Sequence, residues 1–178
     1  MTAKQPKRIG VYAGTFDPVH SGHVTFALQA LQAAKLDKVY FLPERQPRSK
    51  QHVEHFGNRV AMLLRATQPH PQFEVLELVD VNFSVERTLP KLQRQFEGDQ
   101  LVFLFGSDVL AGLQDWPKVD KLLSETELVI GLRHQDNRDK MHKLIEAWPI
   151  QPRVLTMFPS YAPEVSSGRV REALRLLP

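Results

Sequence analysis

Short apolar runs alternate along the chain with longer stretches that have helical periodicity. The run at residues 101–105 is uninterrupted, as expected for a strand of a parallel sheet that is covered on both faces. Strands are expected at residues 9–12, 39–42, 73–78, 101–105, 128–131 and 153–157. Helices are expected at residues 24–34, 58–67, 88–96, 119–123, 140–148 and 167–177. This alternation predicts an α/β fold: a Rossmann-like, doubly wound parallel sheet with helices on both faces.

The composition is typical of a globular protein, with 42% hydrophobic and 24% charged residues. At 178 residues, the chain is expected to form a single domain, 1–178, that is large enough to bury a core. It contains no cysteine, which excludes disulfides, thiolate catalysis and Cys-ligated zinc. Because a reducing compartment is compatible with this composition, a cytoplasmic location is expected.

Neither a membrane nor a nucleic acid is expected as a partner. Every apolar run falls well short of the ~20 residues needed to cross a bilayer, and no signal peptide follows the basic N-terminus. The net charge of +3 suits small anionic substrates. No basic stripe interleaved with aromatic residues points to nucleic acid. Assembly of the chain into a homo-oligomer is left open.

The most informative segment is the turn at residues 14–23, GTFDPVHSGH, which lies between the first expected strand and helix. A glycine-containing turn at this place binds phosphate in α/β proteins, because the helix N-terminus offers unpaired N–H groups and partial positive charge. His20 and His23 are three residues apart and so share one face of the first helical turn. Two imidazoles there can stabilise the charge that develops during phosphoryl or nucleotidyl transfer.

This segment resembles the motif of the nucleotidyltransferase superfamily that carries H-x-G-H, and its flanks resemble the bacterial nicotinate-nucleotide adenylyltransferases. The resemblance implies a nucleotidyltransferase-type fold. It also implies transfer of AMP from ATP, bound with Mg²⁺, to nicotinate mononucleotide in NAD biosynthesis, with release of pyrophosphate. His20 and His23 would then be catalytic. The residues that match the motif are Gly14, Thr15, Phe16, Asp17, Pro18, His20, Gly22 and His23. Those expected to bind ATP are Gly14, Thr15, Phe16 and Gly22.

A second segment, VSSGRVR at residues 165–171, opens the last expected helix. Taken alone, it is an ordinary helix cap followed by a surface arginine. It also resembles the superfamily's I-S-S-T-x-I-R motif, which implies that Ser166 and Ser167 hold the triphosphate and that Arg171 binds the β- and γ-phosphates. Gly168 stands where the family has a threonine or serine. Since its backbone N–H remains, phosphate binding is expected to be weakened rather than lost.

A third segment, residues 105–123, resembles the family's G-x-D segment with a following tryptophan. The resemblance implies that Gly106 admits a nucleotide to the strand end, that Asp108 accepts hydrogen bonds from ribose, and that Trp116 stacks on a pyridine ring. Arg133 would lie near the adenine of ATP. Lys50 ends a proline-containing loop that resembles the family's phosphate-side loop, and surface charge explains it equally well. The longest irregular segment, residues 44–57, is a candidate substrate lid.

The expected acceptor pocket departs from the family pattern. The family has S-Y-T-x-x-T before its middle helix, whereas this chain has SVERT, which keeps Ser84 and Thr88 but places Glu86 between them. A carboxylate turned inward there would repel the acid group of nicotinate. The alternatives are therefore the same transfer to nicotinamide mononucleotide, phosphopantetheine or a cytidylyltransferase substrate, or a nucleotide-binding module that has lost catalysis. No carboxylate cluster resembles a metal cage, so a resident metal is not expected and Mg²⁺ would arrive with ATP.

Overall fold

The computed structural model describes residues 5–47, 52–133, 136–161 and 166–175. Its centre is a six-stranded sheet in the order β3-β2-β1-β4-β5-β6, and every pair of neighbouring strands is parallel. The chain starts in the middle of the sheet, builds one edge and then returns to build the other. Ligands bind in such sheets at the carboxyl ends of the strands where the order reverses, here between β1 and β4. The strands are β1 (Arg8–Gly14), β2 (Lys38–Pro43), β3 (Phe73–Val75), β4 (Gln100–Gly106), β5 (Glu127–Leu132) and β6 (Leu155–Pro159).

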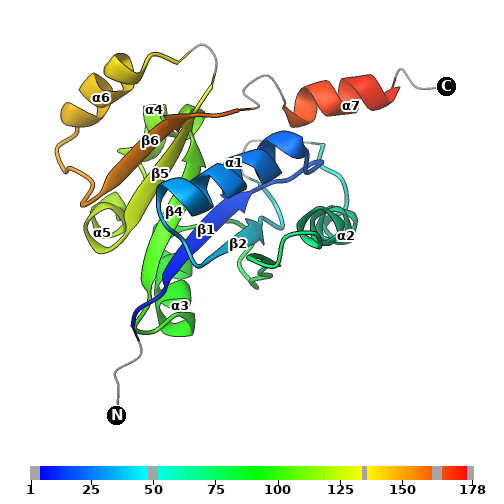
Figure 1. Ribbon diagram of the computed structural model, residues 1–178, viewed down its shortest axis with the longest axis horizontal. Coiled ribbons are helices and arrows are strands. Elements are labelled where there is room, and N and C mark those ends of the chain that lie inside the picture. The colour runs from blue at the N-terminus through cyan, green and yellow to red at the C-terminus, as the bar shows by residue number, and fades with distance from the viewer. Residues whose placement is uncertain (1–4, 48–51, 134–135, 162–165, 176–178) are drawn as a thin grey trace.

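Helices connect the strands and cover both faces of the sheet (Figure 1). The helix α7 lies away from the sheet, beside the turn that precedes α1, and the C-terminal end of the chain follows it (Figure 1). The helices are α1 (Ser21–Ala33), α2 (Phe56–Thr67), α3 (Val85–Gln95), α4 (Leu110–Leu113), α5 (Val119–Glu125), α6 (Arg138–Glu146) and α7 (Ser167–Arg175), with a 3-10 turn, η1, at Ser107–Val109.

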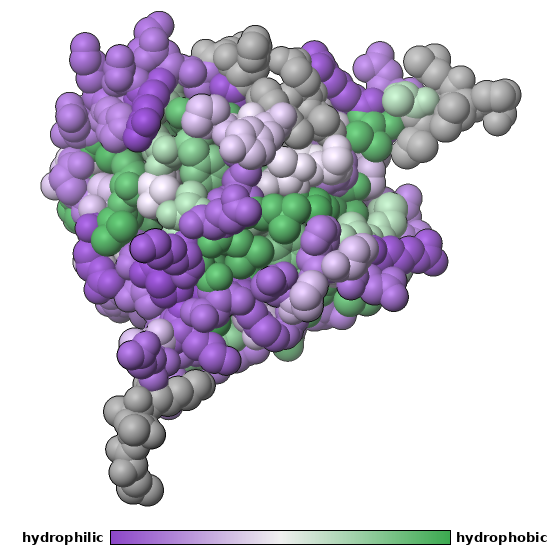
Figure 2. All heavy atoms as spheres, viewed as in Figure 1, coloured by the Kyte–Doolittle hydropathy of each residue, from purple (hydrophilic) through white to green (hydrophobic). Residues whose placement is uncertain are grey.

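The core consists of two apolar layers, one on each face of the sheet. Residues of α1 and α2 pack on one face, and residues of α3, α4, α5 and α6 pack on the other. The strand β4 contributes to both layers, because Val102 and Leu104 belong to the α1 layer while Leu101, Phe103 and Phe105 belong to the opposite one. This double burial explains why the sequence of β4 is continuously apolar. Figure 2 shows apolar residues across the middle of the visible face, with polar residues around them.

The expected doubly wound α/β fold is therefore confirmed, with differences at the edges of elements. The strand β3 covers only the first half of the expected run 73–78, because Phe73–Val75 is the part that pairs with β2. The strand β6 begins two residues later than expected, at Leu155. The short helical segments η1 and α4 were not expected. The helix α1 begins at Ser21, three residues earlier than expected, so Gly22 and His23 lie in its first turn.

Close packing of α1 on the sheet requires a glycine at position 131. A Cβ atom at Gly131 would lie 2.7 Å from Cε2 of Phe26, a side chain that is only 4% exposed. Gly131→Ala is therefore expected to lower the free energy of unfolding by about 1–3 kcal/mol, as overpacking does. Gly112→Ala, in α4 with open space around the new methyl group, is the matched control and should stabilise by about 0.4–1 kcal/mol. Urea denaturation of both variants tests this, and equal stabilities would contradict it.

Candidate active site

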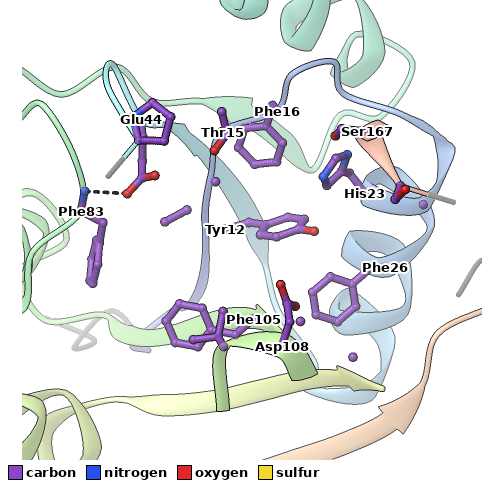
Figure 3. Close-up of a pocket in the computed structure, with 18 of the residues that line it drawn as sticks. Tyr12, Thr15, Phe16, His23, Phe26, Glu44, Phe83, Phe105, Asp108 and Ser167 are labelled. Carbon is purple, nitrogen blue, oxygen red and sulfur yellow. Dashed lines mark hydrogen bonds between the residues drawn. The ribbon is translucent and has the colours of Figure 1, made fainter. Parts of the chain in front are cut away.

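A cavity of about 680 Å³ opens at the carboxyl ends of β1, β4 and β5, and the starts of α1 and α7 also border it. The ring of Tyr12, from the end of β1, lies across its middle (Figure 3). Glu44 and Phe83 lie on one side of Tyr12, and His23 and Ser167 lie on the other (Figure 3). The cavity therefore has a side lined by helix N-termini and a side lined by the loop after β2 and the start of α3.

The two histidines form a stacked pair at the start of α1. His20 is the N-cap residue, and its backbone N–H donates to Nδ1 of His23 over 3.2 Å. The two imidazole rings are 3.7 Å apart between centroids. Because Nδ1 of His23 accepts a hydrogen bond, the proton of its neutral ring lies on Nε2. The pair, with the first N–H groups of α1, presents hydrogen-bond donors at one end of the cavity.

The ring of His20 is held in its neutral form. Burial and then the positive charge of Arg133 lower the pKa of His20 from 6.5 to about 4. Its Nδ1 atom is buried and has no hydrogen-bond partner among the described residues. A buried polar atom of this kind costs free energy unless a ligand or water satisfies it, which is typical of a functional site.

This lowered pKa predicts a pH dependence of stability. Between the folded pKa of about 4 and the unfolded value of 6.5, the unfolded state binds more protons, so stability falls as pH falls through this window. His20→Asn keeps a favourable N-cap. As the pH falls through this window, its melting temperature should decrease less than that of the wild type. Parallel curves for the wild type and His20→Asn, measured by thermal denaturation, would contradict the assignment.

Arg171 connects α7 to the turn before α1. Its Nη1 donates to the backbone carbonyl of Asp17 and, over 3.2 Å, to Oδ2 of the same residue. Asp17 is buried, whereas 41% of the Arg171 side chain is exposed and borders the cavity. The hydroxyl of Ser167 donates to the carbonyl of Pro18 over 2.9 Å. The two phosphate segments expected from the sequence therefore meet at one end of the cavity, where Ser166 also lines it.

A second cation borders the cavity at the end of β5. Arg133 forms an ion pair of 3.2 Å with Asp108, and more than half of each side chain is exposed. A pair so exposed adds little to stability and can exchange partners when a charged ligand enters. A Cβ atom at Gly106 would lie 2.5 Å from Oδ1 of Asp108, so the glycine leaves room for that carboxylate. Burial, followed by the charge of Asp108, raises the pKa of Tyr12, whose hydroxyl thus stays protonated.

The opposite side of the cavity is aromatic. Trp116 lies 5.8 Å from Phe105 and 6.0 Å from Phe83 between ring centroids. Oε1 of Glu44 accepts a hydrogen bond of 3.0 Å from the backbone N–H of Phe83 (Figure 3). This bond ties the loop after β2 to the start of α3, where Ser84 lines the cavity.

One expectation for the acceptor side needs correction, and one condition is settled by the geometry. Thr88 is buried and does not line the cavity, because its hydroxyl donates to Asp80 over 3.2 Å and accepts from the N–H of Ser84. It therefore stabilises the start of α3 rather than lining the cavity. Glu86 is exposed and does not line the cavity, so its carboxylate is not turned inward. Lys50 lies outside the described residues.

Comparison with known proteins agrees with this geometry. The cytidylyltransferase-like family model matches residues 11–173. The nicotinate-nucleotide adenylyltransferase of Bacillus subtilis is 36% identical over 130 residues, covering 69% of this chain and 68% of the relative. A probable nicotinate-nucleotide adenylyltransferase of Neisseria gonorrhoeae is 33% identical over 175 residues, covering 94% of this chain and 87% of the relative. The chain belongs to the cytidylyltransferase-like family, among the nicotinate-nucleotide adenylyltransferases.

Solved structures share the fold of this nucleotidyltransferase. Plasmodium falciparum nicotinic acid mononucleotide adenylyltransferase, complexed with NaAD, superposes with a TM-score of 0.76 over 93% of this chain and 83% of that one, at 19% identity. The same enzyme complexed with APC gives a TM-score of 0.74. In the part of the chain that the structure describes, no helix is long and apolar enough to cross a bilayer.

Tyr12 and Glu44 are among the cavity residues that were not singled out from the sequence. In the sequence, Tyr12 is the last residue of an expected strand and Glu44 is the first residue of an expected loop, so neither was assigned a role in the cavity. The available signal was their place at the carboxyl ends of β1 and β2, where ligands bind in sheets of this kind.

Proposed function

We propose that the protein transfers the AMP moiety of ATP to nicotinate mononucleotide, which releases pyrophosphate and forms deamido-NAD. The observation that carries this proposal is the cavity itself, which places the stacked His20–His23 pair opposite an aromatic wall that includes Trp116. One side suits the phosphates of ATP and the other suits a pyridine nucleotide. The relatives named above carry the same activity in their names.

The transfer needs no covalent enzyme intermediate. An oxygen of the acceptor phosphate forms a bond to the α-phosphorus of ATP, and the bond from that phosphorus to the bridging oxygen of pyrophosphate breaks. Nε2–H of His23 donates to charge that develops on the phosphate oxygens, and the first N–H groups of α1 add to this. Arg171, with Ser166 and Ser167, holds the leaving pyrophosphate. For this, its guanidinium must exchange part of its contact with Asp17 for phosphate oxygens.

Further roles follow from the placement of the remaining side chains. Gly14, Thr15, Phe16 and Gly22 shape the phosphate turn, and Arg133 lies on the nucleotide side of the cavity. Asp108 accepts from ribose hydroxyls after Arg133 turns to the ligand, and Trp116 stacks on the pyridine ring. Within the described residues, no group of three or more His, Asp or Glu side chains could hold a metal. We propose that magnesium enters with the substrate as MgATP.

The proposal includes two statements about the whole protein. Residues 1–178 act as one nucleotidyltransferase domain, which the continuous sheet and the family match over residues 11–173 support. The protein works in the cytoplasm, where ATP and mononucleotides are available. Homo-oligomer formation, which the sequence leaves open, is tested by the size of the protein in solution.

A pyrophosphate-release assay tests the acceptor. ATP and Mg²⁺ are supplied with nicotinate mononucleotide, nicotinamide mononucleotide or phosphopantetheine in turn, and CTP replaces ATP as the control donor. The proposal predicts release with ATP and nicotinate mononucleotide in clear preference to the other pairs. Preferred release with another acceptor would keep the chemistry and overturn the substrate. If the protein binds ATP but releases no pyrophosphate with any of these acceptors, the proposal that it is an enzyme is overturned.

A further inference from the structure

Arg59, on α2, is an arginine buried to 1% exposure that does not line the cavity. Among the described residues, its guanidinium donates to four backbone carbonyls. Nε donates to Glu54 over 2.9 Å, and Nη1 donates to Thr15 over 2.5 Å. Nη2 donates to Glu44 over 2.9 Å and to Arg45 over 3.0 Å. One side chain therefore joins the phosphate turn, the loop after β2 and the segment before α2.

The first two of these segments both border the cavity, where they follow the neighbouring strands β1 and β2. Thr15 lies in the phosphate turn beside Phe16, whereas Glu44 is on the acceptor side and accepts the N–H of Phe83 through its carboxylate. The N–H of Glu44 also donates to the carbonyl of Gly14 over 2.9 Å. Arg59 thus closes a continuous chain of hydrogen bonds from the phosphate turn to the start of α3.

The electrostatic surroundings keep this guanidinium in place. Burial lowers the pKa of Arg59, and the nearby carboxylates of Asp17, Glu44 and Glu54 act in the opposite direction. An arginine remains charged at any pH of interest. The ring of Phe56 covers the guanidinium, with its centroid 5.4 Å from Cζ of Arg59. A well-packed apolar side chain could anchor α2 without burying a charge, so the position is better explained by what the guanidinium holds.

The shape of the Arg59 side chain is needed to hold these segments together. Its planar fork donates in several fixed directions at once, whereas a lysine ammonium is a compact charge that reaches one place. Transfer between two bound substrates depends strongly on their alignment, and a misplacement of ~1 Å can cost ~10²-fold in rate.

We propose that Arg59 is a positioning residue that sets the spacing between the phosphate turn and the acceptor side, and thereby aligns ATP with the acceptor phosphate. This inference rests on the adenylyl transfer proposed above. Arg59 touches neither substrate. Its loss therefore lowers the rate of transfer without a comparable loss in the binding of either substrate alone.

Arg59→Lys tests this against Arg65→Lys, which changes an exposed arginine on the same helix. The quantity to compare is kcat per ATP-binding site, with sites counted by equilibrium titration so that unfolded protein does not contribute. Arg59→Lys is expected to lower this kcat about 10- to 100-fold, while the Kd of each substrate alone changes by less than about threefold. Arg65→Lys should behave as the wild type. A kcat per site within about twofold of the wild type would overturn the proposal.

A second readout does not depend on activity. Hydrogen exchange at the amides of Glu44 and Phe83 reports the two bonds that continue from Arg59. Arg59→Lys should speed exchange at both amides, and Arg65→Lys at neither. If the wild type transfers AMP to no acceptor, the proposed function fails. Unchanged hydrogen exchange at both amides in Arg59→Lys would overturn the positioning role by itself.

If Arg59→Lys does not fold, Phe56→Leu provides a second test. It removes the ring that covers the guanidinium, and it should lower kcat and speed exchange at the same amides. Wild-type values for Phe56→Leu would then overturn the positioning role.

Discussion

His23→Ala should lower kcat by about 10²–10³-fold, as removal of one donor to a developing negative charge does. The physical reason is that Nε2–H of His23 acts on the phosphate oxygens mainly while charge builds up during transfer. The Kd of ATP should therefore change much less than kcat. Steady-state kinetics with ATP and nicotinate mononucleotide, combined with equilibrium ATP binding, measure both quantities.

The substitution also removes the acceptor for the backbone N–H of His20, which belongs to the cap of α1. His23→Gln separates the two effects, because a glutamine at this position of a helix can reach back to the N-cap N–H. We expect His23→Gln to unfold at nearly the wild-type urea concentration and still to lose most of its activity. His142→Ala, on α6, should keep full activity. Near-normal turnover by His23→Ala would refute the catalytic role of this histidine.

Arg171→Gln should lower kcat/KM for ATP by about 10- to 100-fold, the range expected for loss of a hydrogen-bonded charge at 1.5–3 kcal/mol. Arg171 is the side chain of α7 whose guanidinium reaches the turn before α1, so its removal takes a cation from the pyrophosphate end of the cavity. Arg171→Lys keeps the charge but not the planar fork, and should recover only part of the loss.

Arg169→Gln is the matched control, because Arg169 is an exposed arginine of the same helix that does not line the cavity. It should leave kcat/KM for ATP unchanged. Stability must be compared as well, since Arg171→Gln leaves the buried carboxylate of Asp17 without its ion-pair partner. A well-folded Arg171→Gln variant with wild-type kcat/KM would contradict the assignment of Arg171 to the phosphates.

The sheet and the phosphate turn were predictable because their signals are local. Continuous apolar runs such as β4 indicate strands that are buried on both faces, and the structure confirms this. The glycine-containing turn and the spacing of His20 and His23 placed both imidazoles at a helix N-terminus, where the structure has them.

The sequence-based predictions fail where tertiary contacts determine the structure. Thr88 was expected in the acceptor pocket, but it lies one helical turn after Ser84 and faces Asp80 instead. The strand β3 is short because only three residues find a partner at the edge of the sheet. The contact between Arg171 and Asp17 joins residues 154 positions apart. The partners of Arg59 are backbone carbonyls, which every residue type has, so no sequence pattern marks them. Neither the Arg171–Asp17 contact nor the contacts of Arg59 can therefore be predicted from the local sequence.

Competition between two acceptors tests the assignment of nicotinate mononucleotide as the substrate. The protein is supplied with MgATP and equal concentrations of nicotinate mononucleotide and nicotinamide mononucleotide, and the dinucleotide products are separated and quantified. Their ratio gives the ratio of the two kcat/KM values. If nicotinate mononucleotide is the acceptor, the product is mainly deamido-NAD, formed with one pyrophosphate for each dinucleotide. Mainly NAD, or pyrophosphate release without any dinucleotide, would contradict it.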